Sequence, residues 1–115
     1  MTIDRERFET LVEEAVASLP EWVLETLDNV EVLTEDEPPP GQHLLGLYEG
    51  TPLATRGNHY SWVLPDRITL FVQPILRAAG TNEDALRSLI RHTVAHEIAH
   101  HFGISDERLL ELDVY

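Results

Sequence analysis

Residues 81–103 read TNEDALRSLIRHTVAHEIAHHFG, and this stretch decides the fold. It contains no proline and no internal glycine, and its apolar residues recur at the three- and four-residue spacing of one helix face. The Thr81 hydroxyl is expected to cap the N-terminus by accepting the backbone N–H of Asp84, and acidic residues follow in the first turn, where the helix dipole favours them. Gly103 is typical of a helix end, because glycine tolerates the left-handed turn there. The sequence therefore predicts one long helix.

Within this helix lies the motif His96-Glu97-Ile98-Ala99-His100. Residues four apart share a helix face, with their Cβ atoms about 5–6 Å apart, so both imidazoles can reach a single metal ion. Glu97 lies about 100° around the helix from His96 and is expected to project beside the ion rather than onto it. A base placed there can take a proton from water at the metal. The spacing predicts a metal site with Glu97 as its general base.

Asp106 follows the helix by a few residues and has three possible roles. The chain reversal at Gly103 could carry it back to the ion as a third ligand. It could instead be a first-turn acid of a final helix, where the dipole favours a negative charge. It could also orient a ligand histidine without touching the ion.

Four further histidines lie outside the pair, namely His43, His59, His92 and His101. His101 points about 100° away from its neighbour in the motif, so we expect a structural or solvent-exposed side chain. His92 lies one turn before the motif, at the surface or beside a ligand. His43 and His59 are predicted on a strand and in a loop, from which either could reach a cleft.

Outward from the long helix, the pattern predicts an N-terminal helix, a small sheet and short helical pieces. The first helix has one apolar stripe, and Pro20 starts a short second helix with Trp22, Val23 and Leu27 inward. Strands and the remaining helices are predicted at Val30–Leu33, His43–Tyr48, Tyr60–Leu64, Arg67–Val72, Pro74–Gly80 and Ser105–Leu112. The expected fold is a single α+β domain over residues 1–115, in which a small, mostly antiparallel sheet packs against the motif helix and the N-terminal helix.

Amino-acid composition limits the possible metal ligands and binding partners of the protein. The chain has a net charge of −13 and no cysteine, so a metal must be held by His, Asp or Glu. Residues 1–37 hold 12 acidic residues and two arginines, and a field of this sign repels nucleic acid. The N-terminus does not resemble a signal peptide, and no run approaches the roughly 18 apolar residues of a membrane span. We expect a cytoplasmic protein.

From Thr81 to Asp106 the sequence resembles the zincin metallopeptidases. The pattern His-Glu-x-x-His-x-x-Gly-x-x-Asp is similar to the metzincin-type arrangement with aspartate as third ligand. In size and element order the chain resembles the small bacterial zincin-like proteins sometimes called minimal zincins. The resemblance implies Zn²⁺ held by His96, His100 and Asp106, with Glu97 as general base. Metzincins also have a downstream methionine turn, whereas the only methionine here is Met1.

The leading hypothesis is a zinc-dependent peptidase acting on a peptide or protein substrate. An extended substrate would pair with a sheet edge, at His43–Tyr48 or Arg67–Val72. The developing oxyanion needs a further donor, for which the candidates are Tyr48, His59, Tyr60 and Tyr115. One alternative is a non-catalytic zinc-binding module that stabilises the fold or a partner interface. The other is an acidic interaction domain without metal.

Overall fold

The structure is a computed structural model of the chain, and it describes residues 3–25, 27, 29–50 and 66–103. The described elements follow one another in the order α1 (Arg5–Ala17), α2 (Glu21–Glu25), β1 (Val30–Glu35), β2 (Gly46–Glu49), β3 (Asp66–Phe71), α3 (Val72–Ala79) and α4 (Glu83–His101). The strand predicted at Tyr60–Leu64 and the helix predicted at Ser105–Leu112 lie outside the described residues.

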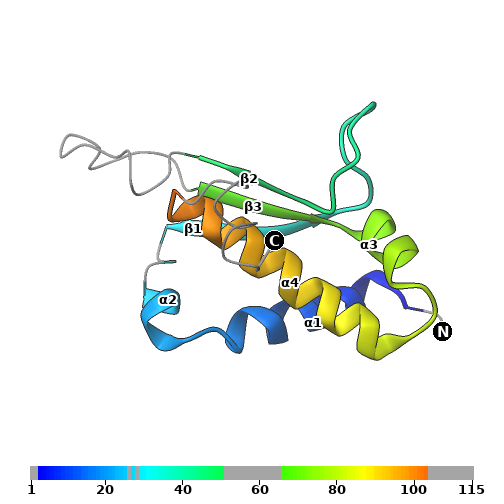
Figure 1. The fold of residues 1–115 in the computed structure, drawn as a ribbon, viewed down its shortest axis with the longest axis horizontal. Helices are drawn as coiled ribbons and strands as arrows, with labels where there is room; N and C mark the ends of the chain where they lie inside the picture. Colours follow the sequence, from blue (N-terminus) through cyan, green and yellow to red (C-terminus); the bar gives the residue numbers. More distant parts are fainter. Residues whose placement is uncertain (1–2, 26, 28, 51–65, 104–115) are drawn as a thin grey trace, which may run out of the picture.

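The three described strands form one sheet in the order β1-β3-β2 (Figure 1). β1 pairs with β3 in parallel, and β2 pairs with β3 antiparallel, with Gly46 opposite Leu70 and Tyr48 opposite Ile68. The sheet of the described residues is therefore mixed, where the sequence predicted a mostly antiparallel one. β3 is the central strand. Its predicted role as an exposed edge for substrate pairing is wrong, because both of its edges are already paired.

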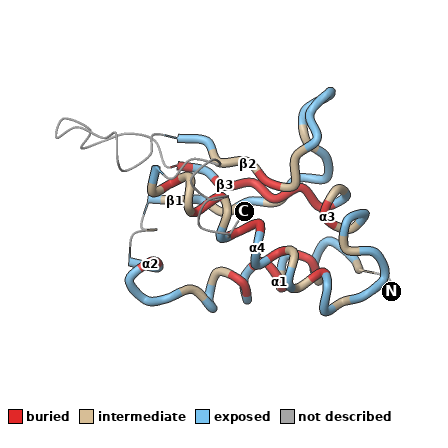
Figure 2. Tube along the Cα trace, viewed as in Figure 1, coloured by how far each residue is buried: buried red, intermediate tan, exposed pale blue. Residues whose placement is uncertain are grey.

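The core lies between the sheet and the long helices. Figure 1 shows α4 running along the sheet with α1 beside it, and Figure 2 shows buried stretches in α1, α4 and β3. The apolar residues that meet there are Phe8, Leu11, Val12 and Ala15 of α1, Ile68 and Leu70 of β3, and Leu86, Ile90, Val94 and Ile98 of α4. These α4 residues recur at four-residue spacing, so burial of this one helix stripe determines which side of α4 is left for the site.

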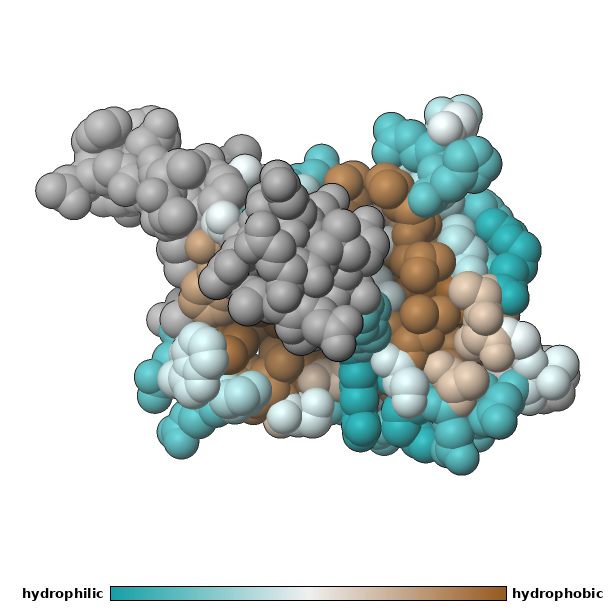
Figure 3. Space-filling model, in the orientation of Figure 1, coloured by the Kyte–Doolittle hydropathy of each residue, from teal (hydrophilic) through white to brown (hydrophobic). Residues whose placement is uncertain are grey.

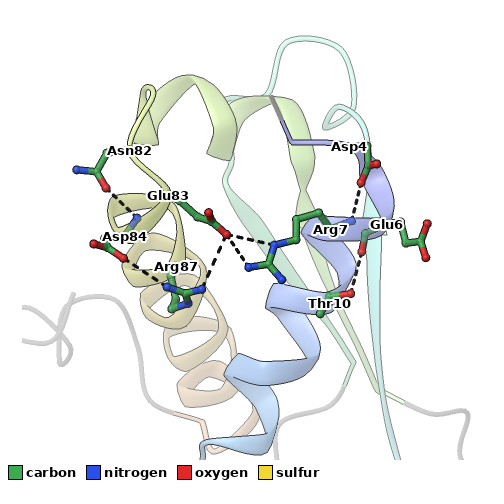
Figure 4. Close-up of polar contacts among 8 residues, drawn as sticks. All are labelled: Asp4, Glu6, Arg7, Thr10, Asn82, Glu83, Asp84 and Arg87. Carbon is green, nitrogen blue, oxygen red and sulfur yellow. Dashed lines mark hydrogen bonds and ion pairs between the residues drawn. The ribbon is translucent and has the colours of Figure 1, made fainter. Parts of the chain in front are cut away.

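Polar contacts cap the N-terminus of α4 and connect it to α1 (Figure 4). Asn82, not Thr81, is the cap: its side-chain oxygen accepts the backbone N–H groups of Asp84 and Ala85 at 2.8 and 3.2 Å. The predicted cap was therefore one residue too early. In the same turn, Glu83 accepts two hydrogen bonds from the guanidinium of Arg7, at 3.1 and 2.6 Å. This pair joins α1 to the start of α4.

Most other predicted elements are confirmed within a few residues. The left-handed glycine Gly103 follows α4 with φ +85°, and Gly80 closes α3 with φ +74°, as expected of helix-ending glycines. Trp22 was predicted to point inward, but its side chain is 64% exposed, while Val23 beside it is buried. In the described part of the chain, no helix combines the length and the apolar character needed to cross a membrane.

Candidate metal centre

The motif histidines and Glu97 converge on one point. One ligand atom from each of His96, Glu97 and His100 lies within 4.8 Å of the others, and no other group of this kind occurs among the described residues. His100 Nδ1 is 3.3 Å from Glu97 Oε1, and His96 Nε2 is 3.9 Å from Glu97 Oε2. The imidazole ring centres are 4.7 Å apart. The helical spacing thus produced the cluster that the sequence predicted.

The three side chains differ in their access to solvent. The side chain of Glu97 is 6% exposed, against 16% for His96 and 27% for His100. All three residues line the cleft, and the two imidazoles are more exposed in it than the carboxylate is. A buried carboxylate held between two imidazoles is positioned to exchange a proton with a group in the cleft.

β2 forms the opposite wall of the cleft and approaches α4 very closely at Gly46. A Cβ atom on Gly46 would lie 2.8 Å from Cγ2 of Thr93 and 3.2 Å from Cγ of Glu97. Ordinary carbon–carbon contacts are about 3.5–4.0 Å, so only glycine allows this approach without movement. Sequence reasoning missed Gly46, because its requirement comes from a helix far along the chain.

The cleft between β2 and α4 has a volume of about 530 Å³. Its described lining includes His43 and His92 as well as the motif residues, so two of the additional histidines do reach it. The apolar part is formed by Leu44, Leu45, Leu47 and Leu89. Figure 3 shows hydrophobic surface running from the start of β2 towards α4 on this face. His59 and Asp106 lie outside the described residues.

His101 occupies a different environment from its neighbour His100. It is 1% exposed, and its Nδ1 lies 2.8 Å from Oδ2 of Asp66, which also accepts a 2.7 Å hydrogen bond from the hydroxyl of Tyr48. Of the two roles expected for His101, the structural one is confirmed. Asp66 was not singled out from the sequence, because its partners are 18 and 35 residues away.

The hydrogen bond from Tyr48 to Asp66 also affects whether Tyr48 could be the donor that stabilises the oxyanion. A phenol has a single proton, and Tyr48 donates it to Asp66. Tyr48 is therefore a poor choice for that donor in this arrangement. The other candidates, His59, Tyr60 and Tyr115, lie outside the described residues.

The donor set suits a zinc ion. Zn²⁺ is bound in proteins by imidazole nitrogen, carboxylate oxygen or thiolate, and a catalytic site keeps a position open beside three protein ligands. His96 and His100 offer two imidazoles on adjacent turns, and both face an open cleft. The residues present thus fit the ion that the motif implies.

A His-Glu-x-x-His helix facing a cleft beside a small sheet defines a metallohydrolase-type site. Comparison with known proteins makes this more specific. The chain belongs to the zincin-like metallopeptidase family, whose model matches residues 22–115. Membership implies a peptide substrate.

A solved structure supports the same fold. The chain is similar to a conserved hypothetical protein from Thermo thermophilus, with 31% identity and a TM-score of 0.60. The alignment covers 87% of this chain and 94% of that protein. No curated protein matches the chain.

Proposed function

We propose that the protein is a zinc-dependent peptidase. In this proposal His96, His100 and Asp106 hold the ion, and Glu97 is the general base. Zinc in such a site supplies Lewis acidity, which polarises the substrate carbonyl and acidifies water. The observation that carries the proposal is the placement of the Glu97 carboxylate, 3.3 Å from His100 and 3.9 Å from His96, at the wall of an open cleft.

Glu97 has two tasks in this scheme. Its carboxylate takes a proton from the attacking water and then gives it to the leaving amine when the peptide bond breaks. Burial to 6% exposure limits competing contact with bulk water, so the proton stays within the site. The two imidazoles keep their positions because they lie on one rigid helix.

The cleft also supports a mode of substrate binding. Among the described strands β2 is paired only with β3, and its other edge has the geometry to pair with an extended peptide. Beyond the histidines, the leucines of the cleft offer an apolar surface. We therefore propose that a substrate lies along β2 and places an apolar side chain against Leu45 and Leu89.

A non-catalytic zinc module is the alternative, and one set of variants separates the two. Zinc content is measured for the wild type, Glu97→Gln and the double variant His96→Ala, His100→Ala, and cleavage is followed with a fluorogenic peptide library. We expect about one zinc per chain in the first two proteins, none in the third, and cleavage by the wild type only.

Glu13→Gln, an exposed acid on α1, is the matched control and should retain both zinc and activity. Undiminished cleavage by Glu97→Gln would refute the mechanism. Zinc binding without cleavage of any library member by the wild type would favour the non-catalytic module.

A further inference from the structure

Asp66 is a buried acid that the mechanism above does not use. It is 2% exposed, and its Oδ2 atom is shared by two partners on different elements. The Tyr48 hydroxyl on β2 donates to it at 2.7 Å, and His101 Nδ1 in the last turn of α4 lies 2.8 Å away. A buried carboxylate is costly unless it is hydrogen-bonded, so removing either partner is expected to be unfavourable.

The backbone of Asp66 extends the connection to the rest of the sheet. Its N–H donates to the carbonyl oxygen of Asn29 at 2.9 Å, just before β1 begins. Asp66 is also the first residue of β3, the central strand. One residue thus links all three described strands to the end of the helix that carries the metal centre.

The face of β2 that meets α4 is shaped around this cluster. Alternate residues of a strand lie on the same face of a sheet, so Gly46 and Tyr48 share one face of β2, and Gly50 directly follows the strand. A Cβ on Gly50 would overlap the Asp66 carboxyl group, with its carbon only 2.5 Å away. At the other end of β2, the space beside Gly46 is taken by Thr93 and Glu97. The lack of a side chain at Gly46 and at Gly50 therefore lets the chain lie close to α4 and to Asp66 respectively.

These contacts join the cluster to the metal centre. His101 immediately follows His100, so fixing His101 fixes the last turn from which the His100 side chain projects. Tyr48 lies two residues from Gly46, where an added Cβ atom would lie 3.2 Å from Cγ of Glu97. The cluster therefore adjoins both walls of the cleft, next to His100 on α4 and near Gly46 on β2.

We propose that Asp66 is a positioning residue of the metal centre, acting through Tyr48 and His101. This role rests on the proposed zinc function. The cluster holds His100 and Glu97 in their binding geometry before the ion arrives, which reduces the ordering that binding must otherwise impose. This buried polar cluster contacts the last turn of α4 from the sheet side.

The test measures zinc affinity in Tyr48→Phe, Asp66→Asn and Asp66→Ala proteins. Zinc dissociation constants are obtained by competition with a chromophoric chelator, and unfolding free energies by urea titration. Residues that orient metal ligands typically change affinity by about 10–100-fold. We expect about tenfold weaker binding for Asp66→Ala and a smaller loss for Asp66→Asn, whose amide oxygen can still accept from both partners.

A control separates positioning from general destabilisation. Val12→Ala removes buried side-chain volume from α1 without touching the cluster, so it should lower stability and leave zinc affinity unchanged. The visible absorption of Co²⁺-loaded protein gives a second readout, because it reports coordination geometry. It should change in the Asp66 variants and in Tyr48→Phe, but not in Val12→Ala.

If the Asp66 variants do not fold, Tyr48→Phe still tests the proposal, because it removes only one hydroxyl group from the cluster. Wild-type affinity and an unchanged cobalt spectrum in Tyr48→Phe and in any folded Asp66 variant would overturn the positioning role and leave the zinc function standing. Failure of the wild type itself to bind zinc would overturn both.

Discussion

Gly46 offers the sharpest test of how the cleft is built, through the substitution Gly46→Ala. The new Cβ would lie 2.8 Å from Cγ2 of Thr93, about 0.7 Å closer than an ordinary carbon–carbon contact. Thr93 cannot simply rotate away, because it is buried and its hydroxyl donates to the carbonyl oxygen of Leu89 at 2.8 Å. Glu97 is also close, with Cγ at 3.2 Å and Oε2 at 3.3 Å. Either β2 must move away from α4 or the Glu97 carboxylate must shift.

The cost can be estimated from this crowding. Overpacking by one methyl group in a well-packed interior costs about 1–3 kcal/mol. Turning Thr93 would add about 1 kcal/mol for the lost hydrogen bond. We therefore expect Gly46→Ala to lower the free energy of unfolding by about 2 kcal/mol in a urea titration. Peptide cleavage should fall as well, since Glu97 is displaced from its place beside the histidines.

Two further variants control the interpretation. Gly41→Ala introduces a side chain at φ +83° with nothing within 4 Å, so it should cost about 1–2 kcal/mol of backbone strain without altering activity. Thr93→Ser removes the crowded methyl group but keeps a hydroxyl, and combining it with Gly46→Ala should recover part of the lost stability. Neighbouring sites typically couple by about 0.5–3 kcal/mol. If the stability losses of Gly46→Ala and Thr93→Ser simply add in the double variant, the close approach of β2 to α4 is refuted. Wild-type stability for Gly46→Ala alone would refute it as well.

Three other predictions concern the helix ends and the metal. Asn82→Ala should lower the free energy of unfolding by about 1 kcal/mol, because the Asn82 side chain caps α4. Thr81→Ala should change the free energy of unfolding little. Equal losses for the two variants in urea titrations would contradict this assignment of the cap. Hydrogen bonding and charge attraction from Arg7 lower the pKa of Glu83, so their pair stabilises the fold above the ordinary glutamate pKa. The stability difference between the wild type and Arg7→Ala should therefore persist at pH 7 and vanish as the pH falls through the lowered pKa. Zinc at a hundred times its dissociation constant should add about 2.7 kcal/mol to stability, seen as a higher melting temperature that a chelator reverses.

The sequence was sufficient for features that depend on neighbours a few residues apart. The periodicity of α4, its glycine end and the spacing of His96 and His100 are local, so each could be predicted. The strand order could not be predicted in this way. Strands that follow one another in sequence usually pair, but β1 and β2 do not. Asp66 escaped notice for the same reason: its side-chain partners come from β2 and α4, and no local pattern links them.

The arrangement of charge explains how an acidic protein can present this kind of site. Most of the excess negative charge lies in residues 1–37, which contain α1, α2 and β1. Only Glu31 and Glu35 of these acids lie on β1, whereas several others lie on α1, which packs beside α4. The interaction of solvent-exposed charges with the site weakens beyond the Debye length of about 8 Å at physiological ionic strength. In the described lining of the cleft, Glu97 is the only acid and it stands among four histidines. Within the described lining, the ionisable groups nearest the metal centre are therefore its own side chains.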